Sequence, residues 1–141
     1  MRYPELIVGA FILNKNGELL LIEGVKWGKK LFIPGGHVEL NETLENALKR
    51  EVLEEVGLDI DVLALLGVQE QICSSEFYKK KHFIFLDYVC KAINLTVQID
   101  KREAQKFLWI HPNAALNLNL SGGTRKTIET FLKKDSSAWK R

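Results

Sequence analysis

Apolar residues gather in short blocks along this chain, and turn-forming residues separate the blocks. The apolar stretch at 6–13 is followed by Asn and Gly residues at 14–17 and by a second apolar stretch at 18–22. Asn and Gly tolerate the positive φ angles of tight turns, so this pattern predicts two antiparallel strands joined as a hairpin. The polar, glycine-containing segment 25–30 then predicts a loop, and 31–33 predicts a short strand.

The sequence Pro34-Gly35-Gly36 predicts a break that neither a helix nor a central strand crosses. Beyond the break, Asn41 or Thr43 can cap a helix that runs to about Val56. Gly57 is placed to end this helix in the left-handed conformation, which glycine adopts without steric cost.

The second half of the chain predicts further strands and a final helix. At 124–134 the apolar residues Ile128, Phe131 and Leu132 follow an i, i+3, i+4 pattern that favours an amphipathic helix. A short helix is expected at 113–116. Strands are expected at 62–72, 82–91 and 107–110, with a weaker candidate at 95–99. Many strands combined with a central and a terminal helix predict an α/β (α+β) domain with a mixed sheet between helices.

Composition and charge narrow the function classes. The 141 residues, 46% apolar and 27% charged, suit one soluble globular domain over 1–141. A net charge of +2 is far from the basic excess of a protein that coats nucleic acid. The N-terminus lacks the layout of a signal peptide and 6–13 is too short to cross a bilayer, so we expect a cytoplasmic protein that does not engage membranes. Cys73 and Cys90 are isolated and are expected to be reduced.

Three carboxylates are spaced to share one face of the predicted helix. Glu51, Glu54 and Glu55 stand at i, i+3 and i+4, beside an apolar row that faces the core. Two negative charges about 6 Å apart repel by roughly 3 kcal/mol at an effective dielectric near 20. A divalent cation with oxygen ligands would relieve this repulsion. The spacing alone nevertheless favours a solvated acidic face with ion pairs to Lys or Arg.

The surrounding residues form a longer motif. Gly36 is followed after five residues by Glu42, and after seven more by the sequence REVLEEVGL at 50–58. This stretch matches the Nudix box, G-x5-E-x7-R-E-U-x-E-E-x-G-U with U apolar, at every defined position. The preceding Pro34-Gly35-Gly36 and the late Trp109 are also similar to features of the family. The chain thus resembles the Nudix (MutT-like) hydrolases, which implies an α/β/α sandwich with the sheet between the box helix and a C-terminal helix.

The resemblance implies a phosphoanhydride hydrolase that uses Mg²⁺ or Mn²⁺. The substrate would be a nucleoside triphosphate, or a nucleoside diphosphate linked to another moiety such as a sugar. Carried over residue by residue, the expected metal ligands are the Gly35 carbonyl, Glu51, Glu54 and Glu55. The same comparison assigns catalytic roles to Arg50 and the box glutamates, and structural roles to Gly36, Glu42 and Gly57. Asn41 stands where many relatives have glycine, and Asn tolerates the left-handed region.

Residues outside the box are open to two interpretations. Glu103, six residues before Trp109, stands where several relatives carry an acidic residue that reaches the metals, or it is a turn residue in a solvated run. Glu70 and Glu76 are alternative general bases. The remaining candidates suit either phosphate and base contacts or ordinary surface and packing roles: His37, His82, Lys26, Lys29, Lys30, 79–81, Trp27 and Phe77.

Two functions from different classes remain at this point. One is hydrolysis of a small nucleotide by a monomer or homodimer, and the other is a non-catalytic Nudix-fold module that binds a nucleotide or RNA. The intact acidic motif favours hydrolysis, and nucleic acid is not expected as a substrate. Within the family, the absence of proline at 72–75 disfavours cleavage of ADP-ribose.

Overall fold

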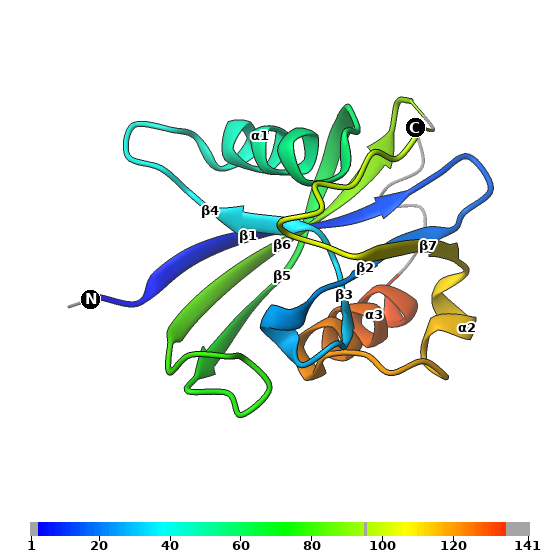
Figure 1. The fold of residues 1–141 in the computed structure, drawn as a ribbon. Coiled ribbons are helices and arrows are strands. Elements are labelled where there is room, and N and C mark those ends of the chain that lie inside the picture. Colours follow the sequence, from blue (N-terminus) through cyan, green and yellow to red (C-terminus); the bar gives the residue numbers. More distant parts are fainter. Residues whose placement is uncertain (1–2, 95, 135–141) are drawn as a thin grey trace.

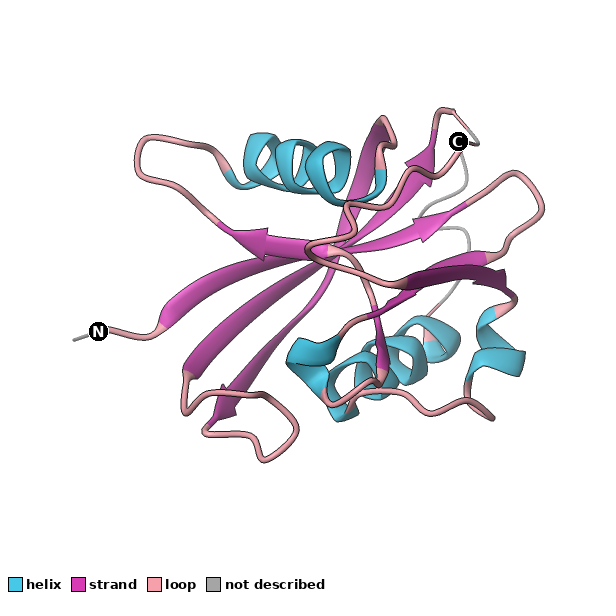
Figure 2. Ribbon diagram, viewed as in Figure 1, coloured by secondary structure: helices cyan, strands magenta, loops and turns pink. Residues whose placement is uncertain are grey.

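The computed structural model describes residues 3–94 and 96–134, which form a mixed sheet with helices on both faces (Figures 1 and 2). The strands are β1 Glu5–Leu13, β2 Leu19–Glu23, β3 Leu31–Phe32, β4 Gly35–His37, β5 Ile60–Ile72, β6 His82–Ala92 and β7 Lys106–Ile110. The helices are η1 Val25–Trp27, α1 Leu44–Val56, α2 Pro112–Ala115 and α3 Gly122–Lys133.

The sheet has the order β3-β2-β1-β6-β5, and β4 pairs with β1 while β7 pairs with β2. β1 and β6 run parallel, and the other paired strands run antiparallel. Figure 1 shows α1 over one face and α3 under the other. This arrangement confirms the predicted sandwich with a mixed sheet between the box helix and a C-terminal helix.

The central strand β1 is apolar along nearly its whole length because helices cover both faces of the sheet. Val8, Ala10 and Ile12 belong to the core under α1. Phe11 belongs to the core above α3, where its ring stacks on that of Phe131. The strong apolar signal at 6–13 thus reflects a strand buried on two sides.

Local signals for turns and caps are confirmed. β1 and β2 form the expected hairpin. Thr43, and not Asn41, caps α1, because its hydroxyl accepts a hydrogen bond from the Asn46 N–H at 3.1 Å. Gly57 ends the helix with φ 70°, and Asn41 adopts φ 67°, the left-handed conformation expected for it.

One expectation about strands is incomplete and another is wrong. The chain does break at 33–34, between β3 and β4, but Gly35–His37 itself forms a strand that pairs antiparallel with β1. This pairing needs glycine, since a Cβ at Gly35 would collide with the Val8 carbonyl oxygen. The weak strand at 95–99 is also absent from 96–99, and Leu95 lies outside the described residues. Instead of pairing with a strand, the Gln98 N–H donates to the Val56 carbonyl at the end of α1, at 2.8 Å.

In the described residues, no helix is long and apolar enough to span a membrane. Both cysteines are free thiols, with Cys73 exposed and Cys90 buried. Burial raises the pKa of Cys90, which makes it an unreactive thiol.

Candidate active site

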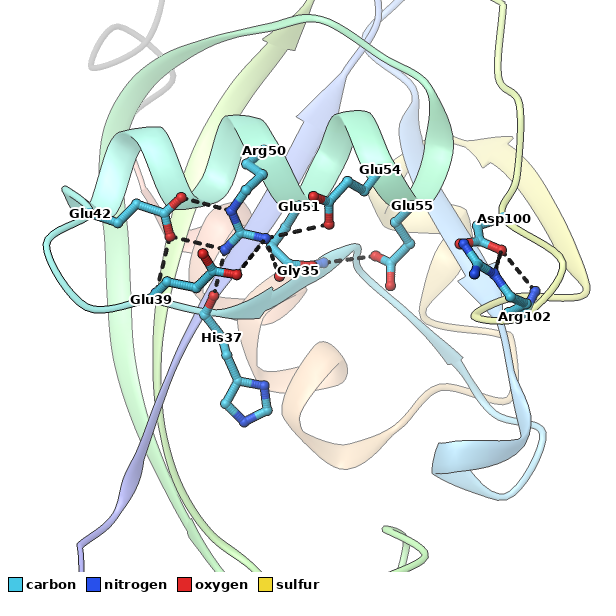
Figure 3. Close-up of polar contacts among 10 residues, drawn as sticks. All are labelled: Gly35, His37, Glu39, Glu42, Arg50, Glu51, Glu54, Glu55, Asp100 and Arg102. Carbon is cyan, nitrogen blue, oxygen red and sulfur yellow. Dashed lines mark hydrogen bonds and ion pairs between the residues drawn. The ribbon is translucent and has the colours of Figure 1, made fainter.

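Arg50, in the middle of α1, is the centre of a network of acidic side chains (Figure 3). Its guanidinium donates two hydrogen bonds to the Glu42 carboxylate, at 2.7 and 2.9 Å. It also donates to Glu51 at 2.9 Å, to Glu54 at 3.4 Å and to the His37 carbonyl at 3.0 Å. The rigid, permanently charged guanidinium of Arg50 therefore connects α1 to the loop before it and holds two of the box carboxylates.

Glu42 is the structural partner of Arg50. The two hydrogen bonds from Arg50, helped by the Glu39 N–H, lower the pKa of Glu42 to about 2. The carboxylate is therefore ionised at any working pH and anchors the loop to α1. This geometry agrees with the structural role that the motif implies for Glu42.

Glu51 lies against β4, where Gly36 leaves room for its carboxylate. A Cβ at Gly36 would collide with the Glu51 carboxyl group. Burial raises the pKa of Glu51, the hydrogen bond from Arg50 opposes this, and the like charges of Glu54 and Glu103 add to the increase. Glycine is thus required at position 36 because the Glu51 carboxyl group comes so close. The raised pKa shows that the positive charge of Arg50 does not fully compensate for the burial of Glu51.

Glu55 is the most deeply buried carboxyl of the motif, with only 7% of the residue exposed. Its Oε1 accepts a hydrogen bond from the Gly35 N–H at 3.0 Å. Burial raises the pKa of Glu55 to about 8, and the nearby carboxylates of Glu103 and Glu51 add to this increase. Below about pH 8 a carboxyl in this position stays mostly protonated unless a cation comes close.

Glu54 differs from the other two because its side chain is 61% exposed, and Arg50 is its ion-pair partner. Beside it, the apolar row of the helix is buried, with Leu48, Val52 and Val56 fully covered. The three box carboxylates therefore border the core as the helical period predicts, but they do so at different depths.

A cavity of about 250 Å³ opens beside these carboxylates. Glu51, Glu55 and Glu103 line it, together with Gly35 and His37. Its walls also include the aromatic side chains of Trp27, Phe32, Phe77, Phe83 and Phe85 and a polar group formed by Gln69, Gln71, Asp87 and Thr127. The polar group was missed from the sequence. Its only signal is Asp87, a single acidic residue inside the apolar strand at 82–91.

The donor set at this cavity fits a hard divalent cation by its chemistry. Glu51, Glu55 and Glu103 all line the cavity, the charge of Glu103 raises the pKa of the other two, and all the donor atoms of the three side chains are oxygen. Across residues 3–94 and 96–134, however, no three acidic, His or Cys side chains already form a metal cage. Arg50 holds Glu51 and Glu54, so these carboxylates would have to turn away from Arg50 to bind a cation.

The candidates outside the motif lie in different places. Glu103 lines the cavity, and its carboxylate pairs with Lys26 at 3.0 Å. Glu70 instead pairs with His82, and Glu76 pairs with Lys30 and accepts from the Gly122 N–H. Neither Glu70 nor Glu76 lines the cavity. Glu103 is therefore the acidic residue outside the motif that is best placed to act with the box glutamates.

Some of the basic and aromatic candidates line the cavity, and others lie away from it. His37 lines the cavity and its ring bonds Glu5 at 2.6 Å, while Lys81 pairs with the other Glu5 oxygen. The ring centroids of Trp27 and Phe77 lie 4.7 Å apart at the cavity wall. Among the remaining lysines, Lys79 lies over the ring of Tyr78. Lys29, Lys30, 79–81 and His82 do not line the cavity.

Without metal, the stability of the protein is expected to fall as the pH rises from 4.5 to about 8, the ordinary and the folded pKa of Glu55. The folded protein holds this proton more tightly than the unfolded chain, so the stabilisation is complete below pH 4.5 and is lost as Glu55 ionises. In EDTA, Glu55→Gln should show a smaller fall in melting temperature over this range, because only the contributions of Glu51 and Asp87, whose pKa values are also raised, remain. Glu45→Gln, at an exposed position on α1, should keep the decline. An equal decline in all three proteins would contradict the role given to Glu55.

The sequence was compared with protein families and with proteins of known name. A sequence model described as NUDIX domain matches residues 4–131. The 8-oxo-dGDP phosphatase NUDT18 of Danio rerio is 35% identical over 107 residues, which cover 73% of this chain and 31% of the zebrafish protein. Nucleoside triphosphatase NudI of Escherichia coli (strain K12) is 30% identical over 129 residues, 85% of this chain and 86% of NudI. The chain therefore spans about a third of the first relative's length and most of the second's.

A solved structure agrees with the fold. The crystal structure of a MutT NUDIX hydrolase from Burkholderia pseudomallei superposes with a TM-score of 0.79 at 25% sequence identity. The match covers 92% of this chain and 98% of the other.

Proposed function

This chain belongs to the NUDIX domain family and is a hydrolase of the Nudix type, and we propose that it cleaves a phosphoanhydride bond of a small nucleotide with the help of Mg²⁺ or Mn²⁺. The proposed substrate is a nucleoside triphosphate, or a nucleoside diphosphate linked to another moiety. The observation that carries the proposal is the set of crowded carboxylates, Glu51, Glu55 and Glu103, along one cavity next to the complete box.

In this proposal Glu51, Glu54, Glu55 and the Gly35 carbonyl hold the cation. A bound divalent cation neutralises the diphosphate and lowers the pKa of the attacking water. Arg50 holds Glu51 and Glu54 next to the cavity, and these two carboxylates would turn from Arg50 toward the cation when it binds. Glu103 supplies a further carboxylate from the other side of the cavity, as a ligand or as the general base.

The names of two relatives support a nucleoside phosphate as substrate. One is an 8-oxo-dGDP phosphatase and the other a nucleoside triphosphatase. The cavity supports the same class, because both acidic residues and aromatic rings line it. A diphosphate with its cation suits the acidic residues, and a flat heterocycle suits the rings.

The deciding experiment is a nucleotide panel with product analysis. Nucleoside triphosphates, nucleotide sugars and dinucleotides would be incubated with the protein and Mg²⁺, and the products separated by anion-exchange chromatography. We expect release of pyrophosphate from a triphosphate or of two phosphorylated fragments from a linked diphosphate. If none of these compounds is turned over while nucleotides still bind, the protein is the non-catalytic binding module.

Divalent metal is also expected to stabilise the folded protein. A cation that binds only the native carboxylates adds RT ln(1 + [L]/Kd), about 2.7 kcal/mol at a hundredfold excess over Kd. Thermal unfolding in EDTA and in millimolar Mg²⁺ measures the difference, which corresponds to a rise of several degrees. Glu51→Gln should reduce the rise. Identical midpoints with and without metal would indicate an acidic face that is only solvated.

A further inference from the structure

The wall of the cavity is a group of packed aromatic rings. Phe77 lies between Trp27 and Phe83, with ring centroids 4.7 and 5.0 Å apart. Phe85 extends the group at 5.4 Å from Phe83. All four side chains line the cavity. Rings that are already packed together form an ordered apolar surface on which a flat molecule can lie at little entropic cost.

A buried acid, Asp87, lies on the same cavity and takes no part in the carboxylate site. It is 4% exposed and stands in the middle of β6. Its neighbours on the two adjacent strands are both glycines, Gly9 on β1 and Gly67 on β5. A Cβ at Gly9 would collide with the Asp87 Oδ1 atom. Gly9 therefore leaves space for a carboxylate that the fold keeps inside the protein.

Asp87 has fewer hydrogen-bond donors than a buried carboxylate needs. Its Oδ2 accepts from the Gln69 amide and the Thr127 hydroxyl, each at 3.0 Å. Those two side chains carry three hydrogens in all, and the Gly123 carbonyl competes for them. Oδ1 receives no hydrogen bond from the described residues, and burial raises the pKa of Asp87. A donor supplied by a ligand would meet this shortage.

Gln71 adds a second group without a partner. Its Oε1 is buried and has no hydrogen-bond partner among the described residues, although the side chain lines the cavity. Gln71 and Gln69 lie on β5 opposite Phe83 and Phe85, which places them beside the aromatic rings. Because the Gln71 amide breaks no hydrogen bond when it rotates, it can turn its oxygen toward a donor in the cavity.

We propose that Asp87 and Gln71 determine specificity in a nucleobase subsite and select a base with an exocyclic amino group over thymine or uracil. The amino group of adenine, guanine or cytosine brings two N–H donors to the Asp87 Oδ1 and Gln71 Oε1 acceptors. Thymine and uracil carry one ring N–H between two carbonyl oxygens, so an oxygen would face an acceptor. A cavity of about 250 Å³ is slightly smaller than the roughly 300–1,000 Å³ of typical ligand sites, and it has room for a base.

This inference rests on the proposed function and deepens it, and it is tested by kinetics with dATP, dGTP, dCTP and dTTP in Mg²⁺. We expect the best substrate to carry an amino group and kcat/KM for dTTP to be at least about tenfold lower. Asp87→Asn keeps the shape but can present an amide donor, so it should reduce this ratio about tenfold or reverse it. Gln71→Met should raise KM for the preferred base about tenfold without changing kcat.

Controls separate specificity from folding. Gln105→Met, at an exposed glutamine before β7, should behave as the unmodified protein. Gln71→Glu keeps an acceptor at the same place and should keep the preference for an amino-bearing base. Circular dichroism and melting temperature establish that each variant is folded. A dTTP preference in the unmodified protein, or a loss of activity in Asp87→Asn that is equal for all four bases, overturns the proposal.

Binding without metal distinguishes this inference from the proposed function. Calorimetric titration with dAMP, dGMP, dCMP and dTMP in EDTA reports the subsite without any hydrolysis. Tighter binding of an amino-bearing base, lost in Asp87→Asn, supports the subsite even if no nucleotide is turned over, and only the hydrolase proposal then fails. Equal binding of the four monophosphates, or no binding of any, overturns the subsite even if triphosphates are cleaved.

Discussion

Replacement of Glu54 by Gln is expected to lower kcat about 10³-fold and to leave the fold intact. The change keeps the shape of the side chain and removes one of the charges that the proposed function assigns to the cation. In the metal-free protein Glu54 is 61% exposed and contacts Arg50 at 3.4 Å, so little packing is lost. Steady-state kinetics across a range of Mg²⁺ concentrations would measure the effect.

Glu45→Gln is the matched control for this variant. Glu45 is exposed in the first turn of the same helix, away from the three carboxylates, and its replacement should leave kcat close to that of the unmodified protein. Both variants should melt within a few degrees of the unmodified protein, as is usual for exposed positions. A Glu54→Gln protein with unchanged kcat at saturating Mg²⁺ would remove Glu54 from the proposed ligand set.

Glu103→Gln is expected to lower kcat about 100-fold with little change in stability, the scale of a lost general base. Glu103 lies on the segment before β7, far from α1 in sequence, yet it lines the same cavity as Glu51 and Glu55 and raises the pKa of both. Its ion pair with Lys26 is half exposed and contributes little to folding. The pH profile of kcat would show the loss of an acidic limb if Glu103 is the base.

The variant Lys26→Met distinguishes the effect of the Glu103 carboxylate itself from the effect of its ion pair with Lys26. It removes the Lys26 partner and keeps Glu103 free to act at the cavity. If Glu103 matters only through the ion pair, the two variants should lose activity equally. If Glu103 is only a turn residue, Glu103→Gln should have unchanged kcat, and the base would have to be sought at Glu51, since Glu70 and Glu76 lie off the cavity.

The local part of this protein can be predicted from the sequence because its causes act over a few residues. Thr43 caps α1 and Gly57 ends it by backbone geometry that depends on the adjacent turn alone. The i, i+3, i+4 spacing places Glu51, Glu54 and Glu55 along one side of the helix whatever the helix packs against. The motif and the fold class that it implies follow from these same residues.

Contacts between distant parts of the chain decided how deeply each side chain is buried and which groups surround it. The sequence treats Glu54 and Glu55 alike, but the Gly35 N–H of β4 meets only Glu55, and burial there raises the pKa of Glu55 to about 8. Strand β4 pairs with β1, and at Gly35 this pairing admits only glycine, because a Cβ there would collide with the Val8 carbonyl oxygen. This contact depends on residues far apart in the chain, and hydrophobic periodicity carries no information about it.

The sequence by itself determined that three carboxylates share one helix face within the motif, and the oxygen donors of this set suit a divalent cation. Only the tertiary structure brought Glu103 to that face and assembled Gln69, Gln71 and Asp87 beside the aromatic rings. Those residues come from β5, β6 and the segment before β7. The sequence offered Glu103 as one of two interpretations, whereas Gln69 and Gln71 look like ordinary strand residues. They meet because the register of the sheet sets which side chains share a face, and that register is fixed by long-range pairing.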